Sequence, residues 1–156
     1  MRPYPEEVAR IIQAGIAAHF APELRSTYAQ AQLAFSALLF MVLQRDFDGI
    51  AEDLVRSNRE LRALLADADA ALAGISGDEA AAARATIAAL PPPVSDVRLS
   101  SLRAEYDALR AAFATLAPVL EPAADDERLA PLRDLRSRTF AWFAADAKRR
   151  SVPVLG

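Results

Sequence analysis

Alanine limits what this chain can fold into more than any other residue, because it occupies 36 of the 156 positions. It has the highest helix propensity of the amino acids and a low strand propensity. Only five glycines are available for the tight turns that join β-strands. The sequence therefore predicts an all-α fold, organised as a single domain over residues 1–156, and excludes all-β and doubly wound folds.

The longest helical pattern begins near Ser26. From Leu33 to Ala71 apolar and small residues recur at steps of three, four and seven without a change of phase. We expect one very long helix, about residues 26–73, with Gly49 as the point where a kink would fall, since glycine costs about 1 kcal/mol against alanine. Its first half carries a second apolar stripe, formed by Tyr28, Phe35, Leu39 and Val42. A helix that is apolar on both faces is buried, so we expect this half to be central to the core.

Shorter helical patterns surround this one and bring the expected number of helices to about five. A first helix starts at Pro5 and stops at Pro22. Ser76, with Glu79 three residues later, predicts a capping box before an alanine-rich helix over residues 78–90. The clearest apolar stripe consists of Leu99, Leu102, Tyr106, Leu109, Phe113, Leu116 and Leu120. A last helix ends near residue 150, with these side chains inward: Leu132, Leu135, Thr139, Trp142 and Phe143.

The lengths of these helices predict how they assemble. A straight helix over residues 26–73 would be about 70 Å long, whereas the last two helices would each span roughly 30–38 Å. One short partner cannot cover the long helix, so we expect an elongated antiparallel helical bundle. We also expect a homodimer with the long helix in its interface, because two-fold pairing commonly buries a protruding apolar stripe.

Composition excludes several classes of site and partner. Zero cysteines remove disulfides and thiolate zinc sites, and a single histidine leaves little to bind a metal. We therefore expect no cofactor and no metal site, and no catalytic residue is assigned. The net charge of −3 argues against nucleic acid and anionic membranes as partners. The longest apolar run, residues 33–43, is too short to span a bilayer, and the first residues lack a secretory pattern, so we expect a cytoplasmic protein.

Two regions hold the candidate ligand-binding residues. One is the region of His19, Tyr28 and Gln32, and the other is the basic last helix with Arg138. A basic helix could grip a phosphate-bearing ligand. It could equally be a solvated face in which Arg138 pairs with Asp134 four residues earlier. The polar side chains on the long helix either line a pocket or bond to backbone and set helix register: Gln32, Ser36, Gln44, Ser57 and Asn58.

The opening third of the chain resembles a known family. Arg2-Pro3 precedes a helix, Pro22-Glu23-Leu24 follows it, and an Ala/Leu-rich helix ends in Gln44-Arg45-Asp46-Phe47. This arrangement resembles a family of small bacterial all-helical proteins of unknown function that are often encoded near phosphotransferase-like kinases and acyl-CoA dehydrogenases. The resemblance implies an accessory role in acyl-CoA metabolism. The family usually has a basic or histidine residue where this chain has Ala29-Gln30-Ala31-Gln32, and no catalytic residue carries over.

Two functions follow as hypotheses. The first is a non-catalytic cytoplasmic protein that acts through protein–protein interaction, in an accessory or stabilising role. It is motivated by the long two-faced helix and by the missing catalytic motifs. The alternative is a small-molecule binder or enzyme with an interhelical pocket for a phosphate-bearing or acyl ligand.

Overall fold

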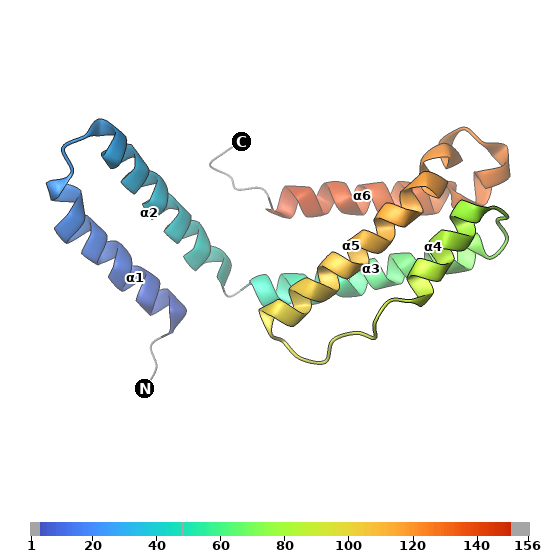
Figure 1. Ribbon diagram of the computed structural model, residues 1–156, viewed down its shortest axis with the longest axis horizontal. Helices are drawn as coiled ribbons and strands as arrows, with labels where there is room; N and C mark the ends of the chain where they lie inside the picture. The colour runs from blue at the N-terminus through green and yellow to red at the C-terminus, as the bar shows by residue number, and fades with distance from the viewer. Residues whose placement is uncertain (1–3, 48, 151–156) are drawn as a thin grey trace. The chain divides into compact units, whose positions relative to one another are not determined.

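The structure is a computed structural model that describes residues 4–47 and 49–150 of the chain. Within these residues it contains six α-helices and no strand, which confirms the prediction of an all-α fold. The chain divides into two compact units, Met1–Ile50 and Ala51–Gly156, and each is described by itself (Figure 1). None of the described helices is long and apolar enough to cross a membrane.

The first unit is a pair of antiparallel helices, α1 (Pro5–Gly15) and α2 (Thr27–Phe47) (Figure 1). Between them lie a π-helix, η1 (Ile16–Phe20), and a 3-10 turn, η2 (Ala21–Glu23). Glutamine side chains join the two helices. The Nε2 of Gln13 donates to the carbonyl of Ala37 at 3.1 Å, and the Nε2 of Gln44 donates to the Oε1 of Gln13 at 3.3 Å.

The predicted long helix is present as two helices rather than one. α2 ends at Phe47, and α3 (Ile50–Leu72) begins three residues later, with Gly49 in a turn. The break falls beside the one glycine in the pattern, where helix propensity is lowest. The apolar residues of both helices fit one seven-residue repeat that runs across Gly49. The spacing alone therefore does not reveal the break.

The prediction that the first half of the pattern lies at the centre of the core is wrong. Among the described side chains of the first unit only Ala9 is buried, and no residue of α2 is. α1 covers one face of α2, on which Leu33, Ala37 and Gln44 lie. At 100° per residue the second apolar stripe lies on the opposite face of the helix. A two-helix unit has no third element of its own to cover that face.

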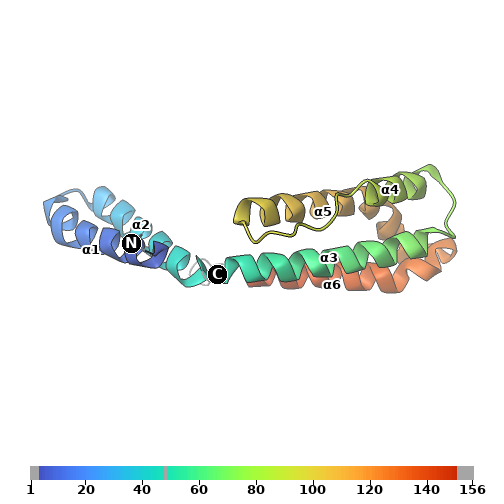
Figure 2. The same ribbon diagram turned by 90° about the horizontal axis from the view of Figure 1, so that it is seen from below.

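The second unit contains the four helices α3, α4 (Asp78–Ala88), α5 (Leu99–Leu120) and α6 (Arg133–Arg150). Figure 2 shows α3 and α6 along one side of this unit, with α4 and α5 along the other. α4 is short, and an extended connector, residues 89–98, leads from its end to the start of α5 (Figure 1). Two 3-10 segments, η3 (Glu121–Ala124) and η4 (Glu127–Leu132), join α5 to α6.

The core of the second unit follows the stripe predicted on α5. Except for Leu99, at its start, every member of the stripe is buried, and α3 supplies Leu61, Leu65 and Leu72 against it. α4 contributes Ala80 and Ala83, whose small side chains allow the helix to approach its neighbour closely. The predicted inward face of the last helix is also confirmed. Leu132, Leu135 and Thr139 are buried. Trp142 and Phe143 are partly buried and pack against the core.

The start of α4 differs from the sequence prediction. Gly77, not Ser76, is the N-cap residue, and no side chain caps the helix. Gly77 has a φ of 134°, a region that residues with a Cβ rarely adopt. The chain therefore uses a glycine conformation at this turn, where the Ser-x-x-Glu pattern predicted a hydrogen-bonded cap.

We predict that Gly77→Ala lowers the free energy of unfolding by about 1–3 kcal/mol, because the new Cβ forces an unfavourable backbone conformation. Gly74→Ala is the matched control, since its added Cβ would meet no atom within 4 Å and its backbone has no such φ. Urea denaturation followed by circular dichroism measures both. Equal effects of the two substitutions would contradict the proposed strain.

Candidate functional site

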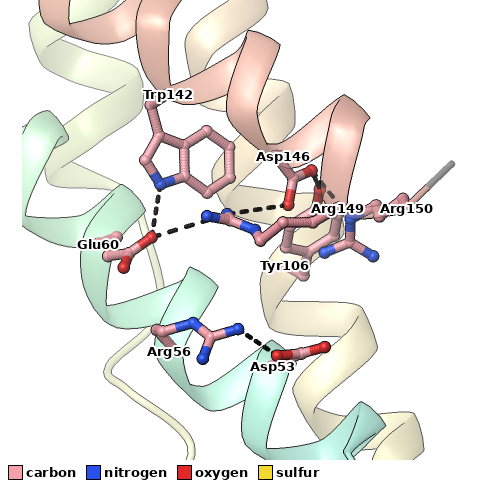
Figure 3. Close-up of polar contacts among 8 residues, drawn as sticks. All are labelled: Asp53, Arg56, Glu60, Tyr106, Trp142, Asp146, Arg149 and Arg150. Atoms are coloured by element: carbon pink, nitrogen blue, oxygen red, sulfur yellow. Dashed lines mark hydrogen bonds and ion pairs between the residues drawn. The ribbon is translucent and has the colours of Figure 1, made fainter. Parts of the chain in front are cut away.

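A cluster of polar and aromatic side chains joins α3, α5 and α6 (Figure 3). Asp146 of α6 lies at its centre and is buried. The Tyr106 hydroxyl of α5 donates to the Oδ2 of Asp146 at 2.6 Å. Arg150 donates from Nε to the same oxygen at 2.9 Å, and the Nη2 of Arg149 lies 3.3 Å from Oδ1. We call this group, with Glu60 and Trp142, the Asp146 cluster.

Glu60 extends the cluster to α3. The indole Nε1 of Trp142 donates to the Oε2 of Glu60 at 2.7 Å, and the Nη2 of Arg149 lies 3.8 Å from the same oxygen. One turn earlier on α3, Arg56 pairs with Asp53 (Figure 3). Glu60 therefore connects α3 to two residues of α6, through one hydrogen bond and one longer ion pair.

Aromatic rings and guanidinium groups pack together in the cluster. The guanidinium carbon of Arg150 lies 4.4 Å from the centroid of the Tyr106 ring, and that of Arg149 lies 5.7 Å from the Trp142 ring. Arg110 lies over the same Tyr106 ring at 5.6 Å. Cations in these positions are attracted by the negative faces of the rings. The arginines thus hold both the carboxylate and the aromatic side chains of the cluster.

The surroundings shift the pKa values of both central groups. Burial raises the pKa of the Tyr106 hydroxyl, and its hydrogen bond to Asp146 raises it further. Burial alone would also raise the pKa of Asp146, but hydrogen bonds from Tyr106 and Arg150 outweigh it and lower that pKa. At neutral pH Tyr106 is a protonated donor and Asp146 an ionised acceptor. Asp146 is engaged on both oxygens, so the cluster ties α6 to α3 and α5 and does not present a free base.

A second polar group forms around Glu105, the residue that precedes Tyr106 on α5. Glu105 is buried, and its Oε1 accepts from the Nε of Arg62 at 2.6 Å. The Nδ2 of Asn58 donates to the Oε2 of Glu105 at 3.1 Å and to the Leu102 carbonyl at 3.0 Å. The backbone amide of Val94, in the connector, lies 3.4 Å from the same carboxylate. These contacts, which we call the Glu105 cluster, hold the connector and α3 against α5.

The Glu105 cluster borders a cavity of about 380 Å³ between α3, α5 and the connector. Asn58 also lines it, and the Oδ1 of that side chain is buried with no hydrogen-bond partner among the described residues. Arg62 spans the cavity edge and donates to the Pro91 carbonyl at 2.9 Å. The Glu105 carboxylate already accepts hydrogen bonds from Arg62, Asn58 and the Val94 amide. These bonds hold the connector in place against α3 and α5.

The candidate residues from the sequence fall in both units. His19 is exposed in the π-helix η1, and Tyr28 and Gln32 are exposed on α2. Arg138 is on α6 in the second unit, where it donates to Asp67 at 2.7 Å and to Asp134 at 2.8 Å. The pairing with Asp134, offered as the alternative to a ligand contact, is therefore present. The structure brings together no ligand-binding set from these four residues within either unit.

A cavity of about 390 Å³ lies between α1 and α2, close in sequence to three of these candidates. Its walls are mainly apolar, and none of His19, Tyr28 and Gln32 lines it. Gln13 and Gln30 reach it, but both amide groups already donate to backbone carbonyls, those of Ala37 and Leu24. The cavity thus offers apolar surface and little polar recognition.

Sequence reasoning treated Tyr106 as a core residue and did not single out Glu105 or Asp146. Asp146 carried a usable signal, because it continues the inward spacing of Leu135, Thr139 and Trp142 on the last helix. An acidic residue on a buried face needs donors around it. Within residues 4–47 and 49–150 no group of three histidine or acidic side chains is placed to hold a metal ion.

In comparisons with known proteins, no family model, curated protein or solved structure matches the chain.

We predict that Tyr106→Phe lowers the free energy of unfolding of the second unit by about 1.5–3 kcal/mol, since it removes a buried hydrogen bond to a charged carboxylate. Tyr28→Phe is the matched control, because Tyr28 is 74% exposed and should change stability by less than about 0.5 kcal/mol. Urea titrations of both variants and the parent chain provide the comparison. A Tyr106→Phe variant as stable as the control would show that the hydrogen bond does not stabilise the fold.

The lowered pKa of Asp146 predicts a pH dependence. A carboxyl group whose pKa is lower in the folded state adds stability above its unfolded pKa of about 4, and this contribution is lost as pH falls through the folded value. Asp146→Asn should therefore be less stable than the parent at neutral pH, and the gap should narrow as pH falls below about 4. Urea titrations across this range measure it. A gap that stays constant or widens in acid would contradict the prediction.

Proposed function

We propose that this protein acts without catalysis, in the cytoplasm, by binding another protein chain through its first unit. One observation carries the proposal: within the first unit, nothing covers the second apolar stripe of α2. Tyr28 is 74% exposed, Phe35 48% and Leu39 50%, on the face of α2 opposite α1. Val42, at the end of the stripe, is half-buried. We call these four residues the α2 stripe.

The two units differ in how much of their own apolar surface they bury. The second unit encloses a continuous core along α5. The first unit buries only Ala9 among its described side chains. Most of the stability of a helix in a protein comes from packing of its apolar face. The first unit therefore gains stability when another surface covers it, as expected of a docking module carried by a stable support.

The size of the exposed surface agrees with this role. An aromatic side chain buries roughly 150–250 Å², so Tyr28 and Phe35 together leave roughly 250 Å² in water. Monomers rarely leave contiguous apolar patches above a few hundred Å². Elsewhere on the same unit, further apolar side chains are also at least half exposed. The residues concerned are Tyr4, Ile11, Phe20, Met41 and Leu43.

An interaction through the α2 stripe agrees with the expected accessory role, and with the coiled-coil type of packing that the apolar spacing of this helix predicts. The resemblance to bacterial helical proteins encoded near acyl-CoA dehydrogenases stays a hypothesis about which process the protein assists. The stripe does not indicate which process this is, because no charged residue between Thr27 and Gln44 could recognise a charged group such as a phosphate.

The proposal predicts that the α2 stripe is open in the free chain. Hydroxyl-radical footprinting of the full-length protein, at the lowest concentration that gives a signal, should label Tyr28 and Phe35 readily. Tyr106 and Phe113 serve as internal controls of the same residue types, because they are 2% and 5% exposed and should react slowly. Labelling of Tyr28 and Phe35 as slow as that of the controls in a monomeric chain would mean that the chain covers its own stripe, and the proposed function would be wrong.

A further inference from the structure

We propose that the partner of the α2 stripe is the same stripe of a second copy of this chain, with the two α2 helices antiparallel. This inference rests on the proposed function and names the partner. The stripe has the spacing that a helix pair requires. Tyr28, Gln32, Phe35, Leu39 and Val42 follow one another at steps of four, three, four and three residues, which is the seam of a coiled coil.

The absence of charged residues from Thr27 to Gln44, which includes the whole seam, favours a second copy over a different protein. A two-fold interface brings each surface patch against its own copy, so a patch whose charges all have one sign would repel itself. From Thr27 to Gln44 the sequence has no acidic, basic or histidine residue. Such a helix meets no electrostatic penalty on self-pairing, and it offers no charge by which an oppositely charged partner would be selected.

Gln32 has a role in this arrangement. It is the one polar side chain in the seam, and a single polar residue at such a position commonly specifies the register and the number of helices that pair. In an antiparallel seam Gln32 would lie opposite Val42 of the second copy, and Phe35 opposite Leu39. This replaces the ligand-binding role considered for Gln32 with a role in pairing.

The course of the chain favours the antiparallel direction. Only two residues separate Phe47, the end of α2, from α3, the first helix of the second unit. Parallel pairing would bring two copies of that unit together at one end of the helix pair. Antiparallel pairing places them at opposite ends of a 21-residue helix, about 30 Å apart along its axis, and also aligns the helix dipoles favourably.

The area of the stripe indicates a dimer that dissociates on dilution. Tyr28, Phe35 and Leu39, with Leu43 at the flank (54% exposed), leave on the order of 400 Å² of apolar side chain in water. Two copies would bury about 800 Å² from these residues alone, against a lower limit of about 1,000 Å² in total for specific interfaces. We therefore expect weak association, with a dissociation constant on the order of tens of micromolar or above, and not an obligate dimer.

Analytical ultracentrifugation of the full-length chain over a dilution series tests the pairing. We expect dimer at high concentration and monomer on dilution. The double variant Phe35→Glu, Leu39→Glu should weaken association at least tenfold, because four carboxylates would meet in the seam. Met41→Glu is the matched control: Met41 is 60% exposed on the same helix but lies about 140° away from the seam, and should leave association unchanged. Circular dichroism melts of all three proteins check that the second unit stays folded.

Cross-linking tests the direction, since the chain has no cysteine of its own. A short bis-maleimide should join two copies of Ser36→Cys, because position 36 flanks the two-fold axis of the antiparallel seam. It should not join two copies of Gln32→Cys, which would be about 15 Å apart along the helices. Parallel helices would reverse this result, with position 32 of one copy facing position 32 of the other.

Each outcome decides the proposal. A monomer at every concentration, or a dimer that the double glutamate variant does not weaken, overturns self-pairing. Cross-linking of Gln32→Cys but not Ser36→Cys overturns the antiparallel direction. If the chain is a monomer whose Tyr28 and Phe35 are still readily labelled, self-pairing fails while the proposed interaction function stands. If they are protected in that monomer, both fail.

Discussion

The apolar stripe of α5 organises the second unit. Its leucines and aromatic rings share one core with side chains of α3 and α6, and the short side chains of α4 pack into the same core. Apolar packing of this kind is not directional, and by itself it leaves helices free to slide or rotate. Two polar clusters on adjacent residues of α5 remove that freedom.

Glu105 and Tyr106 are neighbours in sequence and face different partners. The carboxylate of Glu105 is bound by Arg62 and Asn58 of α3 and by the connector, while the hydroxyl of Tyr106 is bound by Asp146 of α6. Both carboxylates are buried, and a buried charge is tolerated only where donors surround it. A shift of α5 along either neighbour would leave a charge without its donors. The clusters therefore specify one register, and the hydrogen bond that shifts the pKa values of Tyr106 and Asp146 is one of the contacts that hold it.

The first unit follows the opposite pattern. Its two helices are joined by glutamine hydrogen bonds between Gln13, Ala37 and Gln44, with almost no buried side chain. α2 carries two apolar stripes where a hairpin can cover one, so the other is available for a second chain. The closed core of the second unit and the open apolar face of the first unit are the basis of the proposed association.

The sequence alone determined the helices and most of their inward faces, since both depend on the spacing of residues within a few turns. The stripe from Leu102 to Leu120 and the inward face of α6 were predictable for this reason. Tertiary structure decided which stripe of α2 is covered, and that Glu105 and Asp146 are buried with donors 40 or more residues away. Those outcomes depend on contacts between segments distant in sequence, which helical periodicity does not encode.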